Sequence, residues 1–117
     1  MPNVLYDLSI LSEMVYGDEE FMKELVNTFI EYAPIDTQEL LSFAAEKNWD
    51  ETAKKAHKLK SSIRTIGVTS LSDLILEIEL DAKNEKVIDQ IPSKISQFEE
   101  TLGRVLESLK NESFVKN

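Results

Sequence analysis

The chain has 117 residues, no cysteine and a formal net charge of −9 at pH 7. This length fits one domain with a buried core, and a hydrophobic fraction of 42% is too high for a disordered protein. The missing cysteine excludes disulfides and thiolate metal sites, and the acidic balance argues against a nucleic-acid-binding protein.

No segment predicts export or membrane insertion. The first residues lack the basic and apolar regions of a signal peptide, and no apolar run approaches the ~20 residues that span a bilayer. We therefore expect a cytoplasmic protein without a membrane partner, and a monomer is the simplest assembly.

Apolar residues recur with a helical period along the chain, and no stretch alternates as a strand does. A short first helix is predicted over residues 6–15, with Gly17 ending it and Asp18 capping the next helix. Pro34 is expected to kink or break that second helix. The expected apolar stripe of the second helix consists of Phe21, Leu25, Thr28, Phe29 and Tyr32.

A third helix is predicted between Asn48 and Gly67. Asn48 followed by Glu51 resembles a capping box, and Gly67 is a natural helix stop. The expected buried side consists of Trp49, Ala53, Ala56, Leu59 or the stem of Lys60, and Ile63.

Two further helices complete the prediction. Ser70 with Asp73 marks the start of the fourth helix, and Pro92 suits the first turn of the last one. Residues 111–117 are expected to fray, apart from docking of Phe114.

Four amphipathic helices with short connections bury their apolar faces best against one another. We therefore predict an all-α protein, an antiparallel up-and-down four-helix bundle with a short extra N-terminal helix covering one end. Residues 1–117 are expected to form a single domain. Large side chains in the stripes are assigned to its core rather than to a cofactor site: Phe21, Met22, Phe29, Trp49 and Phe98.

One segment, residues 52–72, contains no acidic residue although the protein is acidic. Its five cations are Lys54, Lys55, Lys58, Lys60 and Arg64. Such a run is more often a solvated helix face than a binding surface. The single histidine of the chain, His57, lies at its centre and makes this segment the candidate functional site.

Helical spacing turns His57 toward water and places Lys54, Lys60, Ser61 and Arg64 on its face. Imidazole is a nucleophile with an ordinary pKa near physiological pH, so His57 is a candidate acceptor of a phosphoryl group. Ser61 is too small to cover the ring, and the ammonium of Lys60 can stabilise phosphoryl charge.

The segment resembles the motif of histidine-containing phosphotransfer (Hpt) domains, His-x-(Leu/Met)-Lys-(Gly/Ser/Pro)-(Ser/Ala)-x-x-x-x-Gly-Ala. The residues that match are His57, Leu59, Lys60, Ser61, Ser62 and Gly67, with Asn48, Trp49, Asp50, Leu71, Leu74 and Glu79 agreeing in the flanks. The likeness covers residues 5–109. Ser61 where Gly is commonest and Val68 where Ala is usual are modest departures.

The resemblance implies a phosphorelay intermediate in two-component signal transduction. His57 would take a phosphoryl group from the aspartate of one receiver domain and pass it to another, the receivers belonging to response regulators or hybrid histidine kinases. Such a phosphoprotein carries a phosphoryl group without kinase activity, so whether it is an enzyme is a matter of definition. It holds no cofactor or metal of its own, and Mg²⁺ is expected on the receiver.

Geometry adds Glu79 to the candidate site. If the third and fourth helices form an antiparallel hairpin about Gly67, Glu79 lies level with His57 and can orient the ring through the nitrogen that does not attack. The alternative is a solvent-exposed glutamate.

Partner docking is assigned to the cations Lys54, Lys58 and Arg64, while the apolar part of the docking surface stays unassigned. Phe21 and Ile35 are considered for it, but core burial is favoured for both. The competing function is a non-catalytic helical adaptor that binds a response regulator without accepting phosphate. A di-iron bundle is disfavoured, because the chain has one histidine and no Glu-x-x-His pair.

Overall fold

The computed structural model describes residues 5–112 and residue 115, and it contains only helices in these residues. The helices are α1 (Ser9–Met14), α2 (Glu19–Ala45), α3 (Trp49–Ile66), α4 (Thr69–Asn84), the 3-10 turn η1 (Ile88–Gln90) and α5 (Ile91–Lys110). The predicted all-α class is confirmed. The expectations of fraying and of Phe114 docking fall largely on residues 113–114 and 116–117, outside the described residues.

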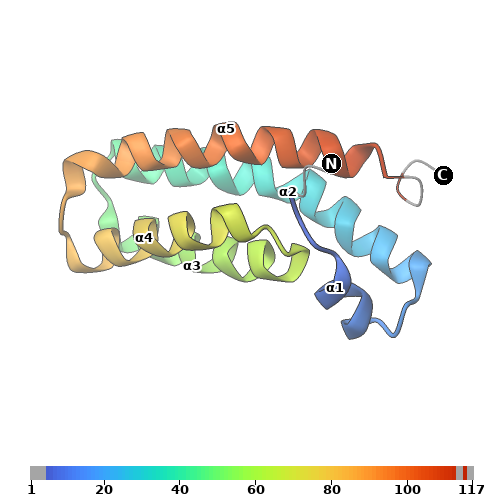
Figure 1. The fold of residues 1–117 in the computed structure, drawn as a ribbon. Coiled ribbons are helices and arrows are strands. Elements are labelled where there is room, and N and C mark those ends of the chain that lie inside the picture. Colours follow the sequence, from blue (N-terminus) through green and yellow to red (C-terminus); the bar gives the residue numbers. More distant parts are fainter. Residues whose placement is uncertain (1–4, 113–114, 116–117) are drawn as a thin grey trace.

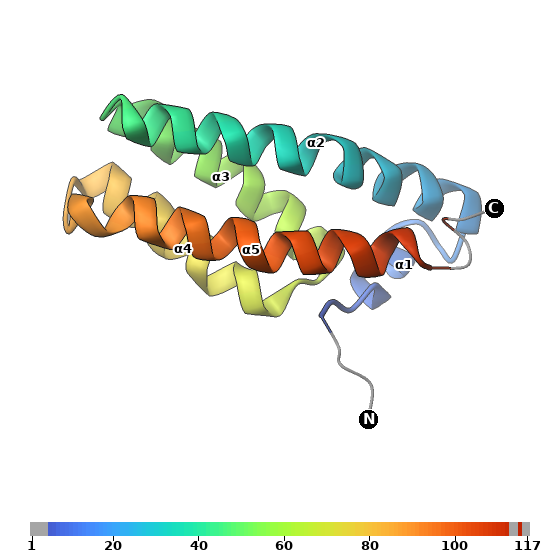
Figure 2. The same cartoon turned by 90° about the horizontal axis from the view of Figure 1, so that it is seen from above.

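Helices α2, α3, α4 and α5 lie side by side, and each runs in the opposite direction to the one before it (Figure 1). Helix α2 packs on α3 and α5, and α4 packs on the same two helices. The short α1 lies against α2 and α3 at one end of the bundle (Figure 2). One continuous core fills the interior, with Phe98, Ile63, Ile75 and Leu40 fully buried.

The start of α2 follows the sequence prediction, but its buried stripe does not. The Asp18 carboxylate accepts from the Phe21 backbone N–H and caps the helix. The stripe instead follows Met22, Val26, Phe29, Ala33, Asp36, Thr37, Leu40 and Ala44. Phe21 and Tyr32 are 49% and 51% exposed, so their predicted burial is wrong. Apolar residues line two adjacent faces of this helix, one with Phe21 and Leu25 and one with Met22 and Val26. Packing of α2 on α3 and α5 buries the second face.

Ile35 is also 49% exposed, which overturns the preference for burying it. Nor does Pro34 break α2, which continues to Ala45 as one ribbon (Figure 2). Proline removes one backbone donor from the helix ladder. Buried Ala33 and Thr37 anchor the helix on either side of it, and the Thr37 hydroxyl donates to the Ala33 carbonyl.

Helix α3 begins and ends as predicted. The Asn48 side chain accepts from the Glu51 N–H, and Gly67 ends the helix with a left-handed φ of 77°. A Cβ at Gly67 would also lie 2.0 Å from the Asp7 carbonyl oxygen, because the Asp7 N–H donates to the Gly67 carbonyl there. Position 67 therefore requires glycine for its backbone and for the N-terminal segment that crosses it.

Helix α4 begins one residue earlier than predicted. Its N-cap is Val68, which is buried and makes no side-chain cap, so Ser70 does not start the helix. Only one residue separates Gly67 from Thr69, and burial of Val68 fixes this tight corner. In α5, Pro92 lies in the first turn as expected.

Candidate phosphoacceptor site on α3

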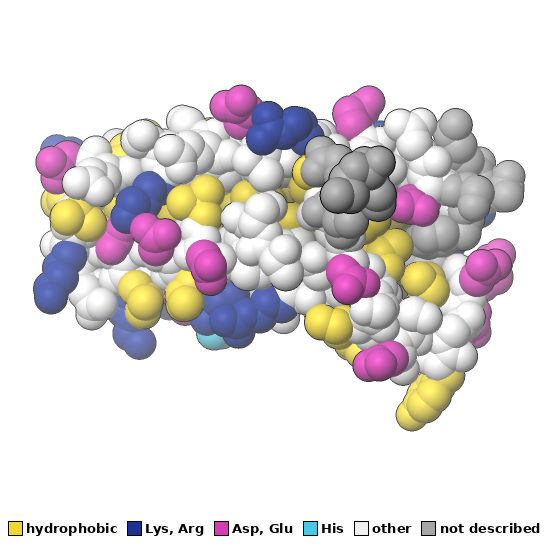
Figure 3. Space-filling model, in the orientation of Figure 1, with side chains coloured by type: hydrophobic (Ala, Val, Ile, Leu, Met, Phe, Trp, Pro, Cys, Tyr) yellow, Lys and Arg dark blue, Asp and Glu magenta, His cyan; other side chains and the backbone are white. Residues whose placement is uncertain are grey.

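The imidazole of His57 projects from the middle of α3 on the side opposite its core contacts. The neighbouring residues Ala56, Leu59 and Ile63 are buried, whereas the His57 side chain is 69% exposed. In Figure 3 the histidine lies at the edge of the molecule beside a group of Lys and Arg side chains.

Glu79 of α4 binds two of the predicted site residues at once. Its Oε2 lies 2.8 Å from His57 Nδ1, and its Oε1 lies 2.7 Å from Lys60 Nζ. The Glu79 and Lys60 side chains are only 13% and 15% exposed. The antiparallel packing of α3 and α4 thus brings together three residues separated by up to 22 positions in the sequence. The solvent-exposed alternative for Glu79 does not fit this geometry.

The electrostatics of Glu79 follow from these contacts. Burial acts to raise the pKa of Glu79, but hydrogen bonds from Lys60 and His57, with the charges of both, outweigh burial and lower it below its ordinary value. The carboxylate is therefore ionised at neutral pH. An ionised oxygen facing Nδ1 accepts a hydrogen bond, so in the neutral tautomer that this contact favours Nδ1 carries the proton and Nε2 keeps its lone pair.

The cations expected around His57 are mostly paired with carboxylates. Lys54 lies 3.6 Å from both Asp50 and Glu51, and Lys58 lies 3.2 Å from Asp36. Lys55 pairs with Glu39 at 2.6 Å and with Asp36 at 3.4 Å. Arg64 is exposed and forms no ion pair within residues 5–112. The surface around His57 therefore carries less net positive charge than the cations of residues 52–72 alone suggest.

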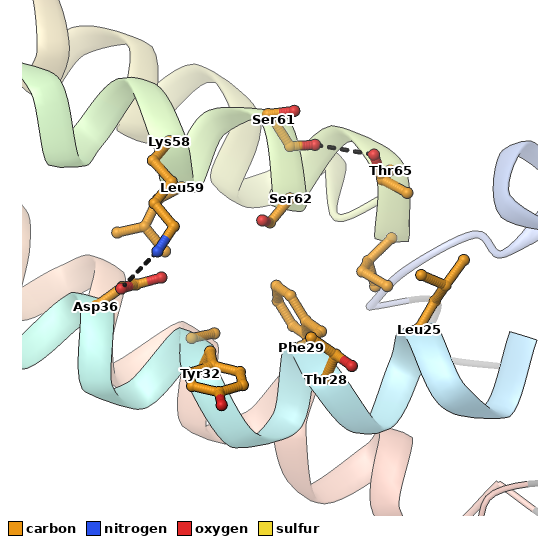
Figure 4. Close-up of a pocket in the computed structure, with 12 residues that line it drawn as sticks. Leu25, Thr28, Phe29, Tyr32, Asp36, Lys58, Leu59, Ser61, Ser62 and Thr65 are labelled. Atoms are coloured by element: carbon orange, nitrogen blue, oxygen red, sulfur yellow. Dashed lines mark hydrogen bonds and ion pairs between the residues drawn. The ribbon is translucent and has the colours of Figure 1, made fainter.

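An apolar groove of about 290 Å³ lies between α2 and α3, beside the face that carries His57. Phe29, Leu25 and Tyr32 form the α2 wall and Ser61 and Ser62 lie on the α3 wall (Figure 4). The ion pair of Lys58 with Asp36 closes one end of it (Figure 4). The sequence predicts Leu25, Phe29 and Tyr32 as one apolar stripe but does not indicate that they line a groove.

A second hollow of about 400 Å³ lies on the other side of His57, between α3 and α4. Its lining includes Glu79, Lys54 and Lys83. Lys83 was not identified from the sequence. The available signal was its position one turn after Glu79 on the same helix.

Two findings bear on metals and membranes. No group of three or more His, Cys, Asp or Glu side chains among the described residues is arranged to hold a metal ion. None of the described helices combines the length and hydropathy of a membrane-spanning segment.

Comparison with known proteins gives one family and one curated relative. The family described as Hpt domain matches residues 24–111. The chain is 32% identical over 72 residues to the phosphorelay intermediate protein YPD1 of Candida albicans, an alignment that covers 59% of this chain and 39% of the relative. No solved structure matches the chain.

Proposed function

This chain belongs to the Hpt domain family, and from that membership we propose that it is a phosphorelay intermediate in two-component signalling. His57 accepts a phosphoryl group from the aspartate of one receiver domain and passes it to the aspartate of another. The observation that carries the proposal is the exposed imidazole whose Nδ1 is held by Glu79 while Nε2 is left to react.

Transfer begins with attack of the Nε2 lone pair on phosphorus. The N–P bond forms as the acyl phosphate P–O bond breaks, and its electron pair stays on the aspartate carboxylate. The ring becomes cationic with its proton on Nδ1, where the Glu79 carboxylate 2.8 Å away stabilises the charge. Return of the phosphoryl group to a second aspartate reverses these steps.

Two neighbours support the transferred group. Lys60 lies one turn from His57, and its ammonium offsets part of the roughly two negative charges of a phosphoryl group. Ser61 is exposed and carries a side chain too short to cover the ring, so a partner can approach Nε2. A Leu at position 61 would close that approach.

The receiver docks on the apolar groove between α2 and α3. Tyr32 and the groove wall supply apolar contact area, and Lys54, Lys58 and Arg64 of α3 supply polar contacts. The Mg²⁺ and most of the catalytic groups belong to the receiver, so this chain is a phosphoryl carrier without kinase activity.

We place a single Hpt domain over residues 1–117, working as a monomer in the cytoplasm without nucleic acid or membrane as a partner. The alignment spans about two fifths of the curated relative. The partners and the pathway of this chain are therefore proposals. The lack of cysteine suits a reducing compartment, and the net charge of −9 repels nucleic acid.

The test is transfer of radiolabel from a panel of receiver domains phosphorylated with labelled acetyl phosphate. We expect label on the wild-type chain that is lost in acid and kept in alkali, as a phosphoramidate is, and no label on His57→Gln. Ser96→Ala is the matched control, because it removes an exposed hydroxyl on α5, outside the groove and the hollow, and should leave transfer intact. Acid-stable label, or label on His57→Gln, contradicts the proposal, and stable binding without transfer supports the adaptor.

A further inference from the structure

His57 separates two unlike concavities. The surface of the groove on its α2 side is mainly apolar, although Lys58 and Asp36 lie at one end, whereas the hollow on its α4 side contains Asp50, Lys54, Glu79 and Lys83. A partner that reaches His57 also meets the charged hollow, since the imidazole forms part of its lining.

Lys83 differs from the other charged groups of this hollow. Glu79 is bound to His57 and Lys60, and the charge of Lys54 is offset by Asp50 and Glu51. Lys83 is exposed and forms no ion pair in the described part of the chain. Its ammonium is thus available to an anionic group that enters beside His57.

We infer that Lys83 is an electrostatic positioning residue that binds the acidic surface around the phosphoaspartate of the docking receiver. This inference rests on the proposed function. An acyl phosphate is an anion held on a carboxylate side chain, so the surface delivered to Nε2 is negative where it meets the hollow. Lys83 attracts that surface from α4 while the apolar groove holds the partner on the α2 side.

The position of Lys83 suits binding rather than chemistry. It lies one turn beyond Glu79 on α4, and Lys60 already shares the Glu79 carboxylate with the ring. A cation at the edge of an interface accelerates association and makes it sensitive to salt, without changing the chemical step. Lys83 also lies in the last turn of α4, where a cation stabilises the helix end, so its test needs more than a stability measurement.

The experiment measures kcat and KM for transfer from the phosphorylated receivers to the wild type, Lys83→Met, Lys83→Arg and Lys110→Met. Lys110 lies in the last turn of α5, at the opposite end of the bundle from the last turn of α4, and serves as the matched control (Figure 1). Binding of the same receivers is measured in a His57→Gln background, where transfer is blocked.

We expect Lys83→Met to lower kcat/KM about threefold to tenfold at low salt. The change should come from a higher KM, with kcat unchanged. Most of the difference should disappear at about 0.5 M salt, because ions then screen the charge of Lys83. Lys83→Arg should restore most of the rate, and Lys110→Met should match the wild type. Normal transfer by Lys83→Met overturns this inference alone. A wild type that neither binds nor accepts phosphate from any receiver overturns the proposed function as well.

Discussion

At the scale of the residue, two opposing effects act on the charge of the Glu79 carboxylate. It is only 13% exposed, and burial disfavours its charge, whereas the ion pair with Lys60 and the hydrogen bond with His57 favour its charge. The contacts prevail, so the group is ionised and the His57 ring is held by Nδ1. The state of one side chain on α4 thereby fixes which nitrogen of His57 is free to react.

A group whose pKa is lower in the folded protein than in the unfolded chain stabilises the fold above its unfolded pKa. That contribution is lost as the pH falls through the lower, folded value. For Glu79 the ordinary value is 4.5, so the loss begins near pH 4.5 and continues below it. We expect Glu79→Gln to destabilise the protein most near neutral pH and progressively less in acid. Urea denaturation of both proteins between pH 3 and pH 7 measures this difference.

Glu77→Gln supplies the control for that series. Glu77 lies two residues earlier on α4, is 57% exposed and pairs with Lys94 at 3.3 Å, so the same chemical change is made at a solvated position. Its effect on the free energy of unfolding should stay below about 0.5 kcal/mol, as for most exposed ion pairs. A Glu79→Gln effect that is constant with pH would show that Glu79 does not contribute through its charge.

At the scale of the element, the direction of the His57 side chain depends on where α3 begins. The Asn48 side chain accepts from the Glu51 N–H, and the Thr52 hydroxyl donates to the Asn48 carbonyl, so the first turn is fastened from both sides. Nine positions separate the cap from His57, which is two and a half turns at 3.6 residues per turn. The cap fixes the first turn of α3, and burial of Ala56 and Leu59 on the core side leaves His57 toward solvent.

Replacement of Asn48 should lower the free energy of unfolding, whereas replacement of Ser70, which was predicted to start α4, should change it little. We expect Asn48→Ala to lower the free energy of unfolding by about 1 kcal/mol, because a backbone N–H loses its side-chain acceptor. Ser70→Ala should change it by less than about 0.3 kcal/mol, since Ser70 lies inside α4 and exposed, where Ala is a good helix former. Chemical denaturation followed by circular dichroism measures both values, and equal losses in the two variants would contradict the assignment of the caps.

At the scale of the whole molecule, four helices contribute to one core, so a buried position on α4 is coupled to the other three. Ile75 is fully buried, whereas Leu80 on the same helix is 44% exposed. We expect Ile75→Ala to cost about 2–5 kcal/mol in a single cooperative transition, and Leu80→Ala to cost less than about 1 kcal/mol. Thermal and urea unfolding measure the contrast. Similar losses in both variants would mean that α4 does not pack as described.

The charge around His57 is also a property of the whole molecule. Residues 52–72 contain five cations and no acid, but Asp36 and Glu39 from α2 and Glu79 from α4 pair with three of the cations. Lys83 comes from a segment outside that run and joins the same hollow. The field that a partner meets is thus assembled from three helices.

Short-range sequence patterns determine the helices of this protein, the bounds of α3 and the exposure of His57. The period of apolar residues specifies helices, the cap of Asn48 and the glycine at position 67 bound α3, and spacing along α3 places His57 opposite Ala56 and Leu59. These features depend on residues within one or two turns of each other. Local sequence is sufficient for them, and the resemblance of the His57 segment to Hpt domains rests on the same short stretch.

Tertiary structure alone decided what depends on packing between helices. Two apolar registers of α2 compete in the sequence, and contact with α3 and α5 leaves Phe21, Tyr32 and Ile35 at the surface. The bond of Glu79 to both His57 and Lys60 needs the angle and height at which α4 meets α3. Such contacts join residues about twenty positions apart or more, and their geometry is set by side-chain packing that no periodicity encodes.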